Sequence, residues 1–178
     1  TSPKDGFELH DLLYTALKSN KIFSIRYGKI NTEYDENYNP KLLNIGEWES
    51  ITKGTDIALL AVGSMVQHAL EVSDLFRKND NLNIGIINCR FIKPLDSEML
   101  DKIKNEYRYI YTIEEGNIAG GFGSSVLEYL SENNCNNYVK LFGIKDRFIE
   151  HGSRKELLDL VNLSSEKIYK AIKSNYEK

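Results

Sequence analysis

Short apolar runs alternate with amphipathic stretches from about residue 56 onward. Each run is bounded by turn-forming residues, as expected of strands buried on both faces. Four strands are predicted, at residues 55–62, 83–88, 109–113 and 138–144. Between them lie segments of ten to fifteen residues with helical periodicity. Such an alternation implies right-handed crossovers, and so a three-layer α/β/α sandwich around a mostly parallel sheet.

Helix starts are marked by capping residues. Ser64 with Gln67, and Ser153 with Glu156, have the spacing of a capping box. Asp96 is the predicted N-cap of the helix after the second strand. A final helix is predicted from Leu163-Ser164 onward.

The first fifty residues do not share this rhythm. Residues 7–20 predict a helix and residues 21–28 a strand, and together (1–30) they resemble the terminal αβ unit of another domain. Residues 31–50 are polar, broken by a proline, and predict a linker. The main domain is then expected at residues 51–178. Because one αβ unit cannot bury both its faces, the rest of its sheet is expected outside this chain. The missing initial Met agrees with a processed product or an excised piece.

Composition excludes several classes of protein. The chain is 41% hydrophobic and 28% charged, with a net charge of -3 and basic residues scattered among acids, so no nucleic-acid surface is expected. Its longest apolar run, residues 57–62, is far shorter than the roughly 20 residues of a membrane helix. Neither a signal peptide nor a disulfide framework is indicated. Cys89 and Cys135 are interpreted as reduced packing residues, and no metal site is predicted.

Residues 114–130 (EEGNIAGGFGSSVLEYL) form a glycine-rich turn followed by a helix. The third glycine of a dinucleotide fingerprint is absent, so that function is not indicated. Gly120, Gly121 and Gly123 favour tight packing, with an anion or partner contact as the alternative. Glu114 and Glu115 point to opposite faces of a strand and cannot share one site. One of them is a candidate acceptor for the amides of the glycine turn.

Three blocks carry a family resemblance: INCRFIKPLD, TIEEGNIAGGFGSSVLEYL and GIKDRFIEHGS. In this order and spacing they resemble the C-terminal domain of the 1-deoxy-D-xylulose-5-phosphate synthase family, in the thiamine-diphosphate transketolase superfamily. The resemblance covers about residues 2–172. Beta subunits of 2-oxo-acid dehydrogenases have a similar glycine turn but usually lack the RFIKPLD-like string. They remain an alternative, as does a non-enzymatic α/β module that binds a partner protein.

The resemblance implies a transferase of isoprenoid synthesis. Such an enzyme condenses pyruvate with glyceraldehyde 3-phosphate, releases carbon dioxide, uses thiamine diphosphate and Mg²⁺, and is a homodimer. FSIRYGK resembles the end of the family's pyrimidine-binding domain, usually Arg-Tyr-Pro-Arg-Gly, whose first arginine binds the acceptor phosphate. That role falls on Arg26. Here Gly28-Lys29-Ile30 replaces Pro-Arg-Gly, so the local loop shape and any contact made by the second arginine are expected to differ from those of the family.

The superfamily's metal motif, Gly-Asp-Gly followed by an Asn, is absent, and the activating Glu belongs upstream of residue 1. The chain alone is therefore expected to bind no cofactor, to be inactive, and to have no catalytic residue. Its expected contributions are acceptor binding and dimer contacts through residues 118–122.

Other candidates are less specific. His151 is a candidate near the acceptor site, although a solvated histidine beside a helix cap is the favoured interpretation, and His10 and His68 are expected at the surface. Arg90 and Lys93 are candidates for pairing with acids at a subunit interface. The resemblance, with a composition rich in Asn and Lys, suggests a plastid (apicoplast-like) or a bacterial-type cytoplasm.

Overall fold

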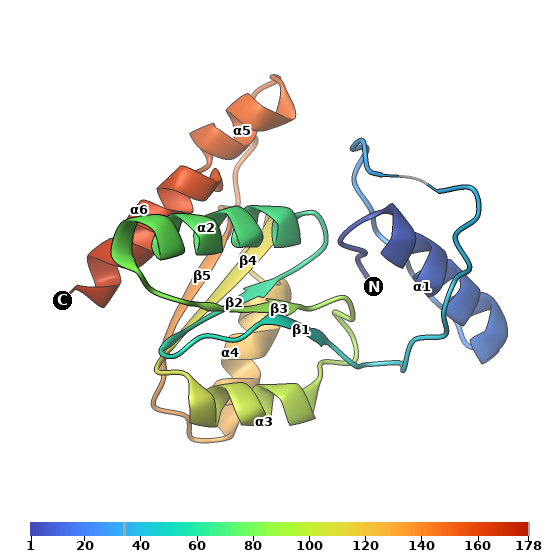
Figure 1. Ribbon diagram of the computed structural model, residues 1–178, viewed down its shortest axis with the longest axis horizontal. Helices are drawn as coiled ribbons and strands as arrows, with labels where there is room; N and C mark the ends of the chain where they lie inside the picture. Colours follow the sequence, from blue (N-terminus) through green and yellow to red (C-terminus); the bar gives the residue numbers. More distant parts are fainter. Residues whose placement is uncertain (34, 178) are drawn as a thin grey trace.

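The computed structural model describes residues 1–33 and 35–177, which form six helices and five strands (Figure 1). Tyr34, in the predicted linker, and Lys178, at the end of the predicted domain, lie outside the described residues. The elements in chain order are α1 (Gly6–Ser19), β1 (Glu49–Thr52), β2 (Ile57–Ala61), α2 (Met65–Asp80), β3 (Gly85–Asn88), α3 (Ser97–Glu106), β4 (Tyr109–Asn117), α4 (Phe122–Glu132), β5 (Tyr138–Ile144), α5 (Arg154–Leu160) and α6 (Ser165–Tyr176).

The sheet has the order β1-β3-β2-β4-β5. The four predicted strands are present and parallel to one another, which confirms the mostly parallel sheet. β1 is an additional antiparallel edge strand on β3. Its four residues, ESIT, have no apolar alternation, and the sequence prediction placed the start of this strand in the linker.

Helices cover both faces of the sheet, which confirms the three-layer sandwich (Figure 1). The sandwich has two apolar cores, one on each face of the sheet, and successive residues of β2 point alternately into one and the other. Leu59 packs with α2 and α6 on one face, and Leu60 packs with α3 and α4 on the other. All five residues of β2 are buried, as the continuous apolar run predicted. None of the helices in the described part of the chain is long and apolar enough to cross a membrane.

The four predicted helix starts are confirmed, and two of the three predicted side-chain caps are present. Ser153 and Glu156 form both bonds of a capping box, and the Asp96 side chain accepts a hydrogen bond from the Met99 amide. The capping box predicted at Ser64 is wrong. Gly63, with φ of 58°, turns the chain into α2, and Ser64 already has helical backbone angles, so its side chain does not face the free amides.

The N-terminal segment contains the predicted helix, α1, but not the predicted strand. Residues 21–28, all of them described, belong to no strand. The Arg26 amide donates to the Thr1 carbonyl at 2.9 Å, and the Thr1 ammonium group donates to the Ser24 carbonyl at 2.8 Å. A strand needs a neighbouring strand, and among the described residues no strand pairs with residues 21–28. Figure 1 shows α1 to one side of the sandwich, with the C-terminus at the opposite side.

Candidate functional site

A cavity of about 1070 Å³ lies between the N-terminal segment and the carboxyl ends of β2, β3 and β4. Ligands of open α/β sheets commonly bind at this end of the strands. Arg26 and Lys29 line the cavity from the N-terminal side, and Glu114, Glu115 and Gly121 line it from the sheet side. The structure therefore brings Arg26 and the glycine turn, which are far apart in the sequence, to the walls of one cavity.

Arg26 is exposed in the wall of this cavity. Its Nη2 donates to the backbone carbonyl of Glu115 at 2.6 Å, and its own carbonyl accepts from Ser2 Oγ at 3.0 Å. Among the described residues, Arg26 forms no ion pair. Its positive charge is therefore not neutralised, and the remaining guanidinium donors can reach a ligand in the cavity.

Glu114 is buried and caps α4 from the preceding strand. Its Oε1 accepts from the Gly123 amide at 2.8 Å, and its Oε2 accepts from the Phe122 amide at 3.0 Å. A carboxylate at a helix N-terminus also interacts favourably with the helix dipole. This geometry confirms that one glutamate of the pair bonds the amides of the glycine turn. Because the Glu114 carboxylate occupies these two amides, they are not free to bind an external anion. The alternative prediction of an anion site at these two amides is therefore wrong.

The glycines of the turn have two different roles. A Cβ on Gly121 would lie 2.1 Å from the Asn117 carbonyl oxygen, and one on Gly123 would lie 2.5 Å from Thr112 Oγ1. Tight packing, the favoured interpretation of these two glycines, is confirmed. Gly120 has φ of 70° and open space around the corresponding position, so its requirement is conformational. Its exposure leaves it available for the predicted partner contact.

Glu115 points to the other face of β4, as predicted from the strand period. Arg154, the first residue of α5, donates to its carboxylate from Nη2 at 2.6 Å and from Nε at 3.1 and 3.2 Å. Ser64 Oγ donates to the same carboxylate at 3.2 Å. This cluster joins the starts of α2 and α5 to the end of β4. The sequence did not indicate it, because 39 residues separate Arg154 from Glu115.

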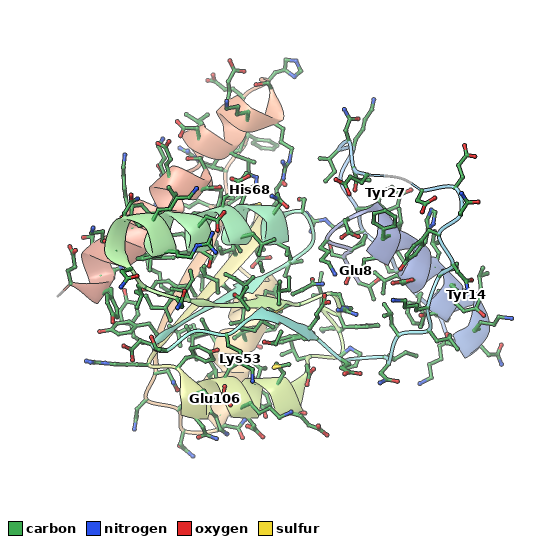
Figure 2. The ribbon with its side chains drawn as sticks, in the orientation of Figure 1. Glu8, Tyr14, Tyr27, Lys53, His68 and Glu106 are labelled. Atoms are coloured by element: carbon green, nitrogen blue, oxygen red, sulfur yellow. The ribbon has the colours of Figure 1, made fainter. Side chains whose placement is uncertain are left out.

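A second ionic cluster fastens α1 to the sheet. Glu8 lies on the side of α1 that faces the sandwich (Figure 2), where Arg90 Nε approaches its Oε1 to 3.0 Å. Arg90 Nη2 lies 2.7 Å from Glu49 Oε2, and Lys4 Nζ lies at the same distance from that oxygen. Burial raises the pKa of Glu49, but the Lys4 and Asn88 hydrogen bonds and the charges of Lys4 and Arg90 outweigh it and lower the pKa. Arg90 thus pairs with acids of its own chain, and its pairing at a subunit interface stays a prediction. Lys93 lines the cavity.

None of the three histidines, all of them among the described residues, lines the cavity. His151 is exposed, and it is not among the residues that line the cavity. His68, expected at the surface, is half-buried on α2 (Figure 2), with Nδ1 2.9 Å from Ser165 Oγ, and burial lowers its pKa. Within residues 1–33 and 35–177 no group of three or more His, Cys, Asp or Glu side chains is arranged to hold a metal ion.

Residues 46–168 match the family model described as "Transketolase, C-terminal domain". A 1-deoxy-D-xylulose-5-phosphate synthase of Aquifex aeolicus (strain VF5) is 39% identical over 172 residues, which cover 97% of this chain and 27% of that protein. A protein of the same name from Clostridium tetani (strain Massachusetts / E88) is 38% identical over 172 residues, covering 96% and 27% respectively. The chain therefore spans about 27% of the length of these curated relatives.

A solved structure described as "Split gene transketolase, inactive beta4 tetramer" has a similar fold. Its TM-score is 0.85 at 25% identity, and the match covers 97% of this chain and 56% of that one. The match includes the N-terminal segment as well as the sandwich. The arrangement of α1 beside the sheet is therefore shared with a solved protein.

Proposed function

Because the chain belongs to the transketolase C-terminal domain family, we propose that it is the C-terminal part of a 1-deoxy-D-xylulose-5-phosphate synthase. The relatives of that name support this over nearly the whole chain. The complete enzyme would be a transferase that condenses pyruvate with glyceraldehyde 3-phosphate and releases carbon dioxide. The relatives of that name favour this proposal over the alternatives of a dehydrogenase beta subunit and a non-enzymatic module.

The role of this part in the reaction is to bind the phosphate of the acceptor. The observation that carries this proposal is the Arg26 guanidinium, which lines the cavity and has a neutral carbonyl as its partner. A planar guanidinium suits a phosphate dianion, because it donates two parallel hydrogen bonds as well as its charge. The aldehyde end of the acceptor would then extend toward the thiamine-binding domains of the complete enzyme.

Thiamine diphosphate and Mg²⁺ would be held by residues outside this chain. The sequence has no Gly-Asp-Gly, and the described residues offer no cluster of metal ligands. The cofactor's carbanion chemistry needs a carboxylate on the aminopyrimidine and a metal on the diphosphate. Isothermal titration of the chain with thiamine diphosphate and Mg²⁺ is expected to show no binding, and micromolar affinity would contradict the proposal.

A homodimer with contacts through residues 118–122 also belongs to the proposal. Support comes from the open space around Gly120 and the exposure of Ala119. Location in a plastid or a bacterial-type cytoplasm stays a prediction from the resemblance and composition, and the domain boundaries at residues 30 and 50 also stay predictions.

Steady-state kinetics of the full-length protein test the role of Arg26. Arg26→Ala is expected to raise KM for glyceraldehyde 3-phosphate by about tenfold or more, the size of one lost charge-assisted interaction. KM for pyruvate should stay within about twofold, because pyruvate has no phosphate for the guanidinium to bind. Arg77→Ala, which removes an exposed arginine paired with Asp74 on α2, is the matched control. Equal changes in both KM values would contradict the assignment.

A further inference from the structure

We infer that Arg154 is a positioning residue, which holds the Glu115 carboxylate so that it does not neutralise Arg26. This inference rests on the proposed function of Arg26 as the phosphate ligand. It assigns a role in acceptor binding to a residue of α5, an element that shares no sequence motif with the Arg26 segment.

The end of β4 extends beyond its hydrogen-bonded ladders. Pairing with β2 ends at Ala61 and Ile113, and the pairing with β5 skips from Ile113 to Asn117. Residues 114–116 are therefore fixed largely by side chains. Glu114 is anchored on one face by the amides of α4, and Glu115 on the other face by Arg154 and Ser64.

Arg26 contacts this segment of β4 and is close to both glutamates. Its Nη2 bonds the Glu115 carbonyl. Its Nη1 and the Glu114 carboxylate lie 3.5 and 3.2 Å, respectively, from the position that a Cβ on Gly116 would occupy. A guanidinium next to carboxylates normally forms a bidentate ion pair. Here both carboxylates have other partners, and Arg26 pairs with neither.

The placement of Arg154 favours a functional explanation. It is the first residue of α5, behind the Ser153 cap, where the helix dipole disfavours a cation. The Glu115 carboxylate offsets this cost, with three nitrogen–oxygen contacts between 2.6 and 3.2 Å. In return, Arg154 neutralises the charge of Glu115. If Arg154 were absent, the half-exposed carboxylate would be free to turn toward Arg26 and compete with the acceptor phosphate.

The test uses acceptor kinetics of the full-length protein with a double variant. Arg154→Ala is expected to raise KM for glyceraldehyde 3-phosphate about tenfold, and to leave KM for unphosphorylated glyceraldehyde within about twofold. Adding Glu115→Gln should restore the parent KM to within about threefold, because the competing charge is removed. Arg154→Lys, which keeps the charge, should remain close to the parent. Arg77→Ala is the matched control for loss of an arginine.

A merely structural role predicts a different pattern. The double variant would then be as impaired as Arg154→Ala, or more, and both acceptors would be affected; that result would overturn the inference. Titration of the same proteins with inorganic phosphate provides a readout that does not depend on turnover, and the affinities should follow the same order. If Arg26→Ala leaves KM for the phosphorylated acceptor unchanged, the proposed function fails. If Arg26→Ala raises it but Glu115→Gln rescues nothing, only the present inference fails.

Discussion

At the scale of single residues, Glu114 controls the start of α4. Its carboxylate satisfies two amides that the helix itself cannot, and it is buried at 6% exposure. Glu114→Ala is expected to lower the free energy of unfolding of the purified chain by about 2–3 kcal/mol, through loss of two charge-assisted hydrogen bonds. Urea denaturation measures the change. Glu128→Ala, at an exposed position of the same helix, should change it by less than about 0.5 kcal/mol.

Gly121 and Gly120 are adjacent but differ in what they tolerate. An alanine at position 121 would bring Cβ against a backbone oxygen, so Gly121→Ala is expected to destabilise the chain by about 3 kcal/mol or more. An alanine at position 120 would contact no neighbouring atom. Gly120→Ala should therefore lower the free energy of unfolding by only about 1 kcal/mol, because alanine disfavours the left-handed backbone conformation. Equal losses of stability in urea would contradict this account. A larger residue at 120 that spares stability but weakens dimerisation would support the proposed interface.

At the scale of elements, the attachment of α1 to the sheet depends on charge. The pKa of Glu49 is lowered in the folded chain, so the stabilisation from its ion pairs is complete above the ordinary glutamate pKa of 4.5 and is lost as the pH falls through the lower folded value. Trp48, buried next to Glu49 and bonded through Nε1 to the Phe91 carbonyl, is the only tryptophan and reports on this region.

The fluorescence maximum of Trp48 is therefore expected to stay constant between pH 7 and about pH 5, and to shift to longer wavelength below about pH 4. Glu49→Gln loosens the attachment already at pH 7, so the shift on acidification should be smaller. An identical acid transition in both proteins would show that other carboxylates control it.

The elements that the sequence predicted well are those whose signal is local. Strand β2 is a continuous apolar run, and the Ser153 cap lies three residues from its partner. Ser64 has the same local pattern, but the left-handed Gly63 turns the backbone just before it. The Ser64 side chain therefore accepts a hydrogen bond from Arg154 and does not cap the helix. Residues 21–28 have strand propensity without a neighbouring strand to realise it.

The candidate site divides in the same way. The opposite directions of Glu114 and Glu115 follow from the two-residue period of a strand, so the sequence could predict them. Arg154 and Ser64 reach Glu115 only because α5 and α2 start at the same end of the sheet. Local sequence patterns do not predict these contacts between distant residues. The crossover connections that bring the residues together depend on the packing of the whole sandwich.

At the scale of the whole molecule, apolar side chains remain uncovered on the N-terminal segment. Leu17 of α1 is 83% exposed, and Ile22 is fully exposed. Leu13, Tyr27 and Leu42 add to this surface. Exposed apolar side chains grouped on one segment are typical of an interaction surface. The uncovered segment is also the one whose predicted strand finds no partner strand.

We predict that this surface packs against the remainder of a pyrimidine-binding domain in the full-length protein. In the isolated chain this surface should then cause self-association. The double substitution Leu17→Ser with Ile22→Ser should reduce the average mass measured by sedimentation at micromolar concentrations. The reason is that burial of these two side chains would contribute about 4 kcal/mol to the free energy of association. Leu160→Ser, at a 53% exposed leucine on α5, is the matched control and should leave the mass unchanged.

In the full-length protein, Leu17→Ser with Ile22→Ser should instead lower the melting temperature, because the surface is expected to be covered there. A full-length protein whose melting temperature does not respond would show that nothing packs on this surface, and the N-terminal segment would then not be the end of a larger domain.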